Sequence, residues 1–194
     1  DVVEYFVQKS LANGIDIIRI FDALNDVRNL KTAVKATIKE GGHVQAALSY
    51  TTSPVHTIEK FVEFAKQMEE MGANSICIKD MAGLLTPYVA YDLVKALKES
   101  VKLPIQLHTH YTAGLASMTV IKAVEAGVDV VDTALSPFAL GTSQPATEAI
   151  VAALKGTQYD TGLDLAKLNE ARGFFAPIRE DALKSGLLNT KMLA

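Results

Sequence analysis

Residues 75–80 read Ser-Ile-Cys-Ile-Lys-Asp, and after a short loop Thr86-Pro87 opens a helix-period segment that runs to Ser100. The run from Ser75 to Lys79 is apolar and short, as is typical of a strand buried on both faces. Thr86 supplies a helix N-cap, and Pro87 suits the first helical position. A buried strand followed by a loop and a helix is the repeating unit of a parallel α/β sheet.

The same unit recurs along the chain. Glycines stand at the expected helix ends, and no linker divides the sequence, so we predict one domain. The predicted strands cover Ile15–Phe21, His43–Tyr50, Ser75–Lys79, Ile105–His110 and Val128–Ala134. The predicted helices cover Val2–Ala12, Val27–Glu40, Thr57–Met71, Pro87–Ser100, Leu115–Ala126, Ser143–Leu154 and Leu165–Lys184.

Five strand-helix units fit either an open doubly wound sheet or most of an eight-stranded barrel. Polar residues favour the barrel, because every predicted strand carries one at or just past its carboxyl end, where a barrel places its active site. No glycine-rich phosphate loop follows the first strand, so a dinucleotide site has little support. These polar residues are Arg19, Asp22, Tyr50, Lys79, Asp80, His108, His110, Asp132 and Thr133.

Composition excludes several classes of protein. The chain has 194 residues, 49% of them hydrophobic, and a net charge of -3, so it is globular and has no basic patch for nucleic acid. No apolar run approaches the roughly 20 residues that cross a bilayer, and no signal segment is recognisable. The single cysteine, Cys77, agrees with a reducing compartment. We therefore predict a cytoplasmic protein that does not insert into a membrane, with partner subunits as the route to any membrane association.

His108 and His110 form the sharpest chemical pattern. Residues two apart on a strand point to the same face, so both imidazoles can reach one cation. The alternative is a pair of histidines satisfied by hydrogen bonds near a loop. Lys79 ends a neighbouring buried strand, where burial disfavours its charge, and a neutral amine can take up carbon dioxide as a carbamate ligand. Its alternatives are an ammonium that reaches the barrel mouth or pairs with Asp80.

Four motifs in order resemble the carboxyltransferase domain of the pyruvate carboxylase, oxaloacetate decarboxylase α subunit and transcarboxylase family. They are Arg19-Ile20-Phe21-Asp22-Ala23-Leu24-Asn25-Asp26, Ile78-Lys79-Asp80-Met81-Ala82-Gly83, Leu107-His108-Thr109-His110 and Gly141-Thr142-Ser143-Gln144-Pro145. The resemblance implies a TIM (β/α)8 barrel. It also implies a divalent metal held by a carboxylated Lys79 together with His108 and His110. Zinc is the expected metal, with manganese or cobalt as alternatives.

The resemblance also implies what this sequence lacks. The family's Leu-Arg-Asp-Ala-His-Gln segment, which supplies a fourth metal ligand and two substrate-holding residues, is absent. The five strands match the family's fourth to eighth, so we expect residues 1–194 to form a partial barrel with C-terminal helices. Such a remnant has two open edges, which favour a homo-oligomer. The remaining strands belong either to a longer natural chain or to a partner.

Two further residues receive roles from the resemblance. It implies that the Thr142 hydroxyl shuttles a proton between the pyruvate methyl group and biotin, although the residue could instead cap a helix near Pro145. It implies that Arg19 binds the substrate carboxylate or enolate oxygen, although a salt bridge to Asp22 or another carboxylate at the mouth is the alternative. Tyr50, Asp80 and Asp132 are expected to orient the residues that bind the metal or the substrate by hydrogen bonds.

The resemblance thus implies transfer of a carboxyl group between carboxybiotin and pyruvate, or the reverse from oxaloacetate. Biotin would arrive on a separate carrier domain or carrier subunit, because the Ala-Met-Lys-Met biotinylation signature is absent here. Residues 50–56 and 145–149 resemble the oxaloacetate decarboxylase α subunit most, whereas Thr142-Ser143-Gln144 favours the carboxylase. The alternatives are a metal-dependent lyase or aldolase of the hydroxymethylglutaryl-CoA lyase superfamily and an inactive assembly fragment.

Overall fold

The structure is a computed structural model that describes residues 2–188; residue 1 and residues 189–194 of the predicted domain lie outside the described residues. Five parallel strands form one sheet in the order β1-β2-β3-β4-β5, so each strand pairs with its neighbours in sequence. The strands are β1 (Ile17–Phe21), β2 (His43–Ser49), β3 (Ser75–Asp80), β4 (Ile105–Thr109) and β5 (Val130–Val131). The five predicted strands are therefore confirmed, in a single parallel sheet.

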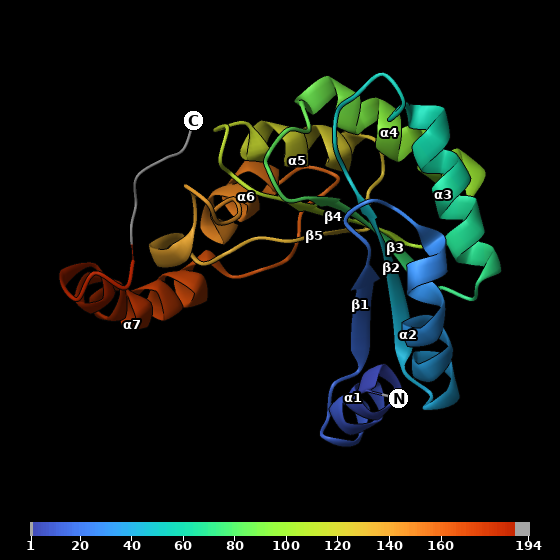
Figure 1. Cartoon of the computed structure of the whole chain (residues 1–194). Coiled ribbons are helices and arrows are strands. Elements are labelled where there is room, and N and C mark those ends of the chain that lie inside the picture. The colour runs from blue at the N-terminus through green and yellow to red at the C-terminus, as the bar shows by residue number, and fades with distance from the viewer. Residues whose placement is uncertain (1, 189–194) are drawn as a thin grey trace.

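Helices cover one face of this sheet. Figure 1 shows α2, α3, α4 and α5 wrapped around its outer side, while α1 lies beyond the amino end of β1 and α7 extends away from the sheet. α1 packs against α2, and α7 contacts α6 and the 3-10 helix η1. The helices are α1 (Val2–Ala12), α2 (Val27–Lys39), α3 (Ile58–Glu70), α4 (Pro87–Ser100), α5 (Ala116–Glu125), η1 (Ser136–Phe138), α6 (Thr147–Leu154) and α7 (Leu165–Lys184).

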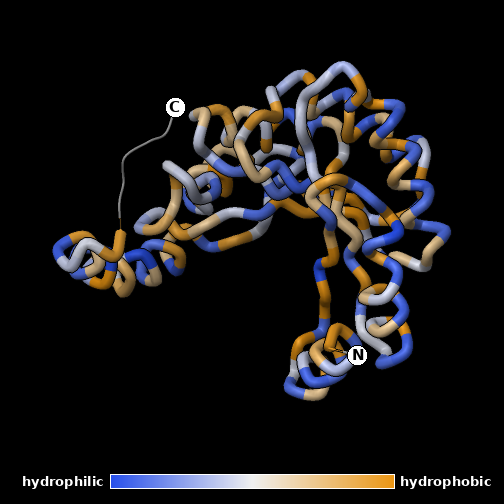
Figure 2. The backbone as a smooth tube through the Cα atoms, viewed as in Figure 1, coloured by the Kyte–Doolittle hydropathy of each residue, from blue (hydrophilic) through white to orange (hydrophobic). Residues whose placement is uncertain are grey.

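The hydrophobic core lies between the sheet and the outer helices. Ile76, Ile78 and Leu107 point from the strands toward the helices, where Phe61 and Leu93 meet them. Full burial of each such side chain stabilises the fold by about 1.5 to 3 kcal/mol. Figure 2 shows hydrophobic residues along the central strands and a mixture of hydrophobic and hydrophilic residues around the helices. This packing leaves the other face of the sheet for polar side chains.

Two predicted elements are shorter by four or more residues in the structure, while the others differ by at most two residues at either end. The helix predicted from Ser143 begins only at Thr147, because Pro145 cannot donate a backbone hydrogen bond and disfavours helix at the residue before it. The backbone there is instead extended and forms a parallel bridge between Ala134 and Ala146. The last strand shrinks to Val130–Val131, since β4 pairs with it only through Gln106 and Leu107.

The inner face of the sheet carries the polar residues that the helices do not cover. Strand alternation places Arg19, Gln45, Lys79 and His108 on this face, with Lys79 and His108 near the carboxyl ends of β3 and β4. Asp132 directly follows β5 and hydrogen-bonds to Arg19 and His108. Strands β1 and β5 form the two edges of the described sheet. None of the helices within residues 2–188 combines the length and apolar character needed to span a bilayer.

Candidate metal-binding and catalytic site

His108 and His110 face each other at the end of β4. Their Nε2 atoms lie 3.1 Å apart, and their rings meet edge to face with centroids 5.0 Å apart. His108 Nδ1 lies 2.7 Å from Asp132 Oδ2, and His110 Nδ1 lies 2.6 Å from the carbonyl oxygen of Thr142. Both predicted ligands therefore converge on one point, each held from behind by an oxygen.

These oxygens fix the tautomers of both rings. An ionised carboxylate and a backbone carbonyl only accept hydrogen bonds, so each Nδ1 must carry a proton. In the neutral form of each ring, Nε2 then presents a lone pair. Two facing lone pairs repel unless a cation or a shared proton lies between them. Two nitrogens on a tetrahedral zinc stand roughly 3.3 Å apart, given metal–nitrogen distances of about 2.0 to 2.1 Å. The observed 3.1 Å separation fits a shared metal.

Asp132 is the acceptor that holds His108. Partial burial alone would raise the pKa of Asp132, but hydrogen bonds from His108 and Arg19, the Arg19 charge and a hydrogen bond from Gln106 outweigh it and lower the pKa to about 2. The carboxylate is therefore ionised at neutral pH and cannot compete with His108 for the proton on Nδ1. The expectation that Asp132 orients a histidine has a direct geometric basis.

Lys79 lies on β3 next to His108 in the strand register. Its Nζ stands 4.7 Å from the centre of the Phe21 ring, which is a cation–π contact. The alternative pairing with Asp80 is not formed, since Asp80 accepts instead from the backbone N–H groups of Leu84 and Leu85 and from the Thr109 hydroxyl. Lys79 thus remains available on the inner face.

The donors suit a borderline divalent metal. Among residues 2–188 no cluster of three or more His, Cys, Asp or Glu side chains could hold a metal. A metal held by His108 and His110 would therefore need a third donor of another kind, and a carbamate on Lys79 would be an oxygen donor. The Cys77 thiol does not serve, because burial raises its pKa to about 12. Two imidazoles and one oxygen suit zinc, manganese or cobalt.

Arg19 forms the salt bridge with a carboxylate that the sequence left open, but its partner is Asp132 rather than Asp22. The Nη1 to Oδ2 distance is 2.9 Å, and the Arg19 side chain is 29% exposed. Asp22 instead accepts from the backbone N–H groups of Leu24 and Asp26 in the loop after β1. Partial exposure leaves part of the Arg19 guanidinium open to a substrate anion.

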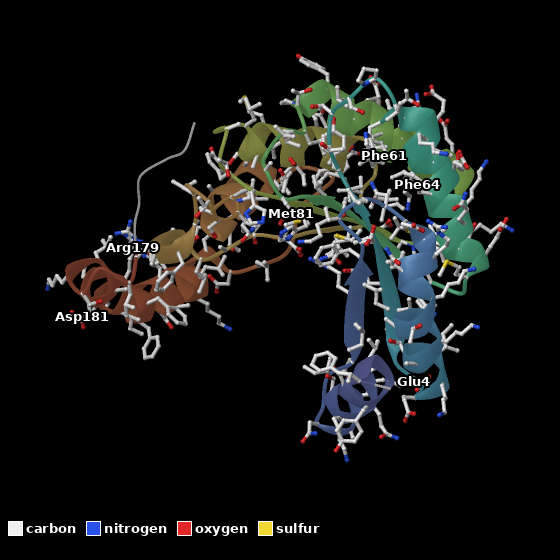
Figure 3. All side chains as sticks on the ribbon, in the orientation of Figure 1. Glu4, Phe61, Phe64, Met81, Arg179 and Asp181 are labelled. Carbon is white, nitrogen blue, oxygen red and sulfur yellow. The ribbon has the colours of Figure 1, made fainter. Side chains whose placement is uncertain are left out.

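Thr142 is an exposed residue in the turn before α6, and its predicted alternative role as a helix cap is wrong. Ala146 occupies the N-cap position of α6. The backbone carbonyl of Thr142, not its side chain, holds His110. Its side chain lines a hollow that also includes Ser136, Leu140 and Arg179. Figure 3 places Arg179 on α7, well away from Met81 at the end of β3.

The loop after β3 packs against the backbone of His110. Asp80 is completely buried. It organises this loop through the hydrogen bonds from Leu84 and Leu85 and ties it to β4 through the one from Thr109. Gly83 has a φ of +68°, and a Cβ there would lie 2.7 Å from the carbonyl oxygen of His110. Tyr50 stacks on Phe61, with ring centroids 5.4 Å apart, and so contributes to packing. Its expected orienting role stays a prediction.

Sequence reasoning missed two glutamines. Gln45 and Gln106 lie on the inner face and bond to Arg19, to Asp132 and to each other. The available signal was a polar residue two positions before or after another on the same strand, as with His43 and Gln45 or Gln106 and His108. In a parallel strand buried on both faces, such spacing marks the inner face.

Comparison with known proteins identifies the family. The HMGL-like family model matches residues 8–174. The chain belongs to the HMGL-like family. It is 66% identical over 180 residues to a pyruvate carboxylase subunit of Methanocaldococcus jannaschii, covering 93% of this chain and 32% of that protein. It is 48% identical over 181 residues to the 2-oxoglutarate carboxylase large subunit of Hydrogenobacter thermophilus, covering 92% and 28%.

Solved structures agree with the fold. The carboxyl transferase domain of Rhizobium etli pyruvate carboxylase, solved with pyruvate and biocytin, matches with a TM-score of 0.89 and 42% identity over 92% of this chain and 31% of that one. The HMGL-like chain thus has a TIM-barrel-type fold, of which the described residues provide five consecutive strands. It spans about a third of the length of the curated relatives it matches.

Proposed function

We propose that this chain carries the histidine-metal part of a biotin-dependent carboxyltransferase site that acts on pyruvate or a related 2-oxo acid. The observation that carries the proposal is the convergence of the His108 and His110 Nε2 atoms, with both Nδ1 atoms already engaged. Similarity to two carboxylases and to a carboxyl transferase domain supports the same reaction class.

We further propose that the described sheet corresponds to the fourth to eighth strands of the family's barrel. The inner-face order of Arg19 on the first strand, Lys79 on the third and the histidines on the fourth supports this assignment. The partners of the proposed site are a 2-oxo acid and a biotin carrier, because carboxyl transfer needs an acceptor and a carboxylated cofactor. The direction favoured by the names of the relatives is carboxylation.

Each residue of the site has a defined task in this reaction. Transfer breaks the bond between the biotin nitrogen and the carboxyl carbon, forms a carbon–carbon bond at the methyl carbon of the oxo acid, and moves one methyl proton to the biotin nitrogen. Arg19 binds the substrate carboxylate or the oxygen that gains negative charge. The Thr142 hydroxyl gives and accepts the transferred proton.

The metal would be held by His108, His110 and a carboxylated Lys79, with zinc favoured over manganese or cobalt. When bound, it supplies Lewis-acid stabilisation of negative charge. The contribution of the chain itself is to keep both Nε2 lone pairs aimed at one point, through Asp132 on one side and the Thr142 carbonyl on the other.

Exchange of isotope between labelled pyruvate and oxaloacetate tests the proposal. The assay uses the intact protein with free biotin and added zinc, and compares His108→Gln with the control His56→Gln, which lies outside the site and contacts Ser53 and Phe61. We expect exchange to fall by about 100-fold in His108→Gln, the upper end of the effect of losing a group that only orients a metal ligand, and to persist in His56→Gln. Equal exchange in both variants would contradict the proposal, and cleavage of a hydroxyacyl-CoA without exchange would favour a lyase.

A further inference from the structure

Four side chains form a closed ring of hydrogen bonds across the inner face. Arg19 Nε donates to Gln45 Oε1 at 2.5 Å, and Gln45 Nε2 donates to Gln106 Oε1 at 2.8 Å. Gln106 Nε2 donates to Asp132 Oδ1, and Arg19 Nη1 closes the ring on Asp132 Oδ2 at 2.9 Å. The ring joins strands β1, β2 and β4 to Asp132, which directly follows β5.

The chemistry of the two end residues determines the orientation of both amides. Arginine can only donate and an ionised carboxylate can only accept, so each glutamine must turn its carbonyl toward Arg19 and its NH2 group toward Asp132. Reversing either amide would place donor against donor or acceptor against acceptor. Gln45 is 4% exposed, so water cannot readily replace a lost partner.

Strand β3 makes room for the ring without joining it. Gln45 stands beside Ser75 in the register, and Cys77 stands beside Gln106. Both β3 residues are small and buried, which lets the two glutamines meet across the strand that separates them. Gln45 Nε2 also donates to Ser75 Oγ at 3.2 Å.

We propose that Gln45 and Gln106 are positioning residues that set the orientation of the Asp132 carboxylate and, through it, of His108. This inference rests on the proposed metal site. Asp132 Oδ2 receives both His108 and Arg19, while Oδ1 receives Gln106. Without Gln106, Oδ1 loses its donor and the carboxylate is held through Oδ2 alone. It can then turn about its terminal torsion, so the acceptor position for His108 is less sharply fixed. Gln45 acts one step earlier by fixing the plane of the Arg19 guanidinium.

The variant Gln106→Met removes the amide and keeps a side chain of similar length. Nitrogen-15 NMR of labelled histidines in the metal-free intact protein reports the tautomer of each ring, with His43, His56 and His110 as internal references. We expect His108 to leave the pure Nδ1–H form while His110, held by a backbone carbonyl, is unchanged. Cobalt titration followed by visible absorption should show about 10- to 100-fold weaker binding, as for loss of other groups that orient metal ligands.

A matched control is Gln158→Met, because Gln158 is exposed on the surface beyond α6. It should leave both the His108 signal and the cobalt affinity unchanged. Gln45→Met, a second ring variant, should weaken cobalt binding less than Gln106→Met because it acts through Arg19. Thermal unfolding of each variant identifies any loss of cobalt binding that comes from unfolding.

Rescue provides the decisive comparison. In Gln106→Glu alone, the new carboxylate would face the Asp132 carboxylate, so acceptor meets acceptor. In Asp132→Asn alone, the new NH2 group would face the NH2 group of Gln106 or the donors of Arg19 and His108, so donor meets donor. Combined, they restore one negative charge and a donor–acceptor pair, so cobalt affinity should recover to within a few-fold of the original protein. An unchanged His108 tautomer in Gln106→Met, or no recovery in the folded double variant, would overturn the inference. These readouts need no carboxyl transfer, so failure of the exchange assay alone would refute the proposed function and not the ring.

Discussion

The two halves of the histidine pair are held in different ways. His108 is oriented by the side chain of Asp132, which belongs to an extended side-chain network, whereas His110 is oriented by the backbone carbonyl of Thr142 in the turn before α6. A side-chain acceptor can be removed by substitution, but a carbonyl persists whatever residue occupies the position. We call His108 with Asp132 the strand-held half and His110 with the Thr142 carbonyl the loop-held half. The difference teaches that substitution of side chains can alter the strand-held half, whereas the loop-held half depends on the shape of the backbone.

Lys79→Ala should have the largest effect on metal binding, because it removes the proposed third ligand of the metal that His108 and His110 would bind together. We expect loss of bound zinc in elemental analysis, with Lys66→Ala on α3 as a surface control. Mass spectrometry of the native protein should show one added carbon dioxide that is absent in Lys79→Ala. Full metal occupancy in Lys79→Ala would refute the carbamate assignment.

Asp132→Asn breaks the strand-held half. We expect about 10- to 100-fold weaker zinc binding in a competition titration, because the Nδ1 tautomer of His108 is no longer enforced. Binding equal to that of the unchanged protein would show that His108 needs no carboxylate partner.

The lowered pKa of Asp132 predicts that the free energy of unfolding depends on pH. The pKa of Asp132 is lowered from 3.8 to about 2 in the fold, so its stabilisation is complete above about pH 4 and is lost as pH falls toward 2. The contribution is on the order of 2 kcal/mol. Urea unfolding of the metal-free protein from pH 5 to pH 2 should show this loss, and Asp132→Asn should flatten that part of the profile.

Gly83→Ala tests the loop-held half. An alanine at this position would have to keep a left-handed backbone, and its Cβ would press on the carbonyl oxygen of His110. We therefore expect a loss of about 2 to 3 kcal/mol in the free energy of unfolding. Gly114→Ala is the matched control, since Gly114 has a φ of +75° but nothing within 4 Å of an added Cβ. It should cost only about 1 kcal/mol. Equal losses of unfolding free energy in the two variants would mean that the backbone near His110 moves to accommodate the added Cβ at little cost.

Thr142→Ala should have the smallest effect on metal binding, within experimental error, because it keeps the carbonyl that holds His110. Its exchange activity is a separate matter, and loss of a proton shuttle should lower the rate by about 10² to 10⁴. Thr142→Ser should retain most of that rate. If Thr142→Ala exchanges normally, the contribution of this residue is confined to its backbone.

The sequence predicted the elements well where the apolar pattern was strong. All five strands and the helices of the outer layer follow from runs such as residues 75–79 and from glycine at helix ends. The prediction failed at residues 143–146, where a local helix pattern gave way to backbone pairing with Ala134 and to the missing N–H of Pro145. Strand β5 was overestimated because its partner residues on β4 are few.

The candidate site was predicted in part. His-x-His spacing placed both imidazoles on one face, which the structure reproduces. No local pattern could show that Asp132 lies behind His108, because that contact joins residues 24 positions apart. Gln45 and Gln106 were overlooked since an amide has no charge to attract notice and its importance comes only from the charged groups at either end. The chemical roles of Thr142, Lys79 and Arg19 remain predictions.

The sequence-ordered sheet has a consequence for how the chain folds during synthesis. Every strand pairs with the one made just before it, so the sheet can grow by short-range steps. Arg19 and Asp132, however, are 113 residues apart. On the ribosome, Arg19 is synthesised 113 residues before its counterion, and the residues of β2 to β5 are made in between. The ion pair can therefore form only after β5, the fifth strand of the described sheet, has been synthesised.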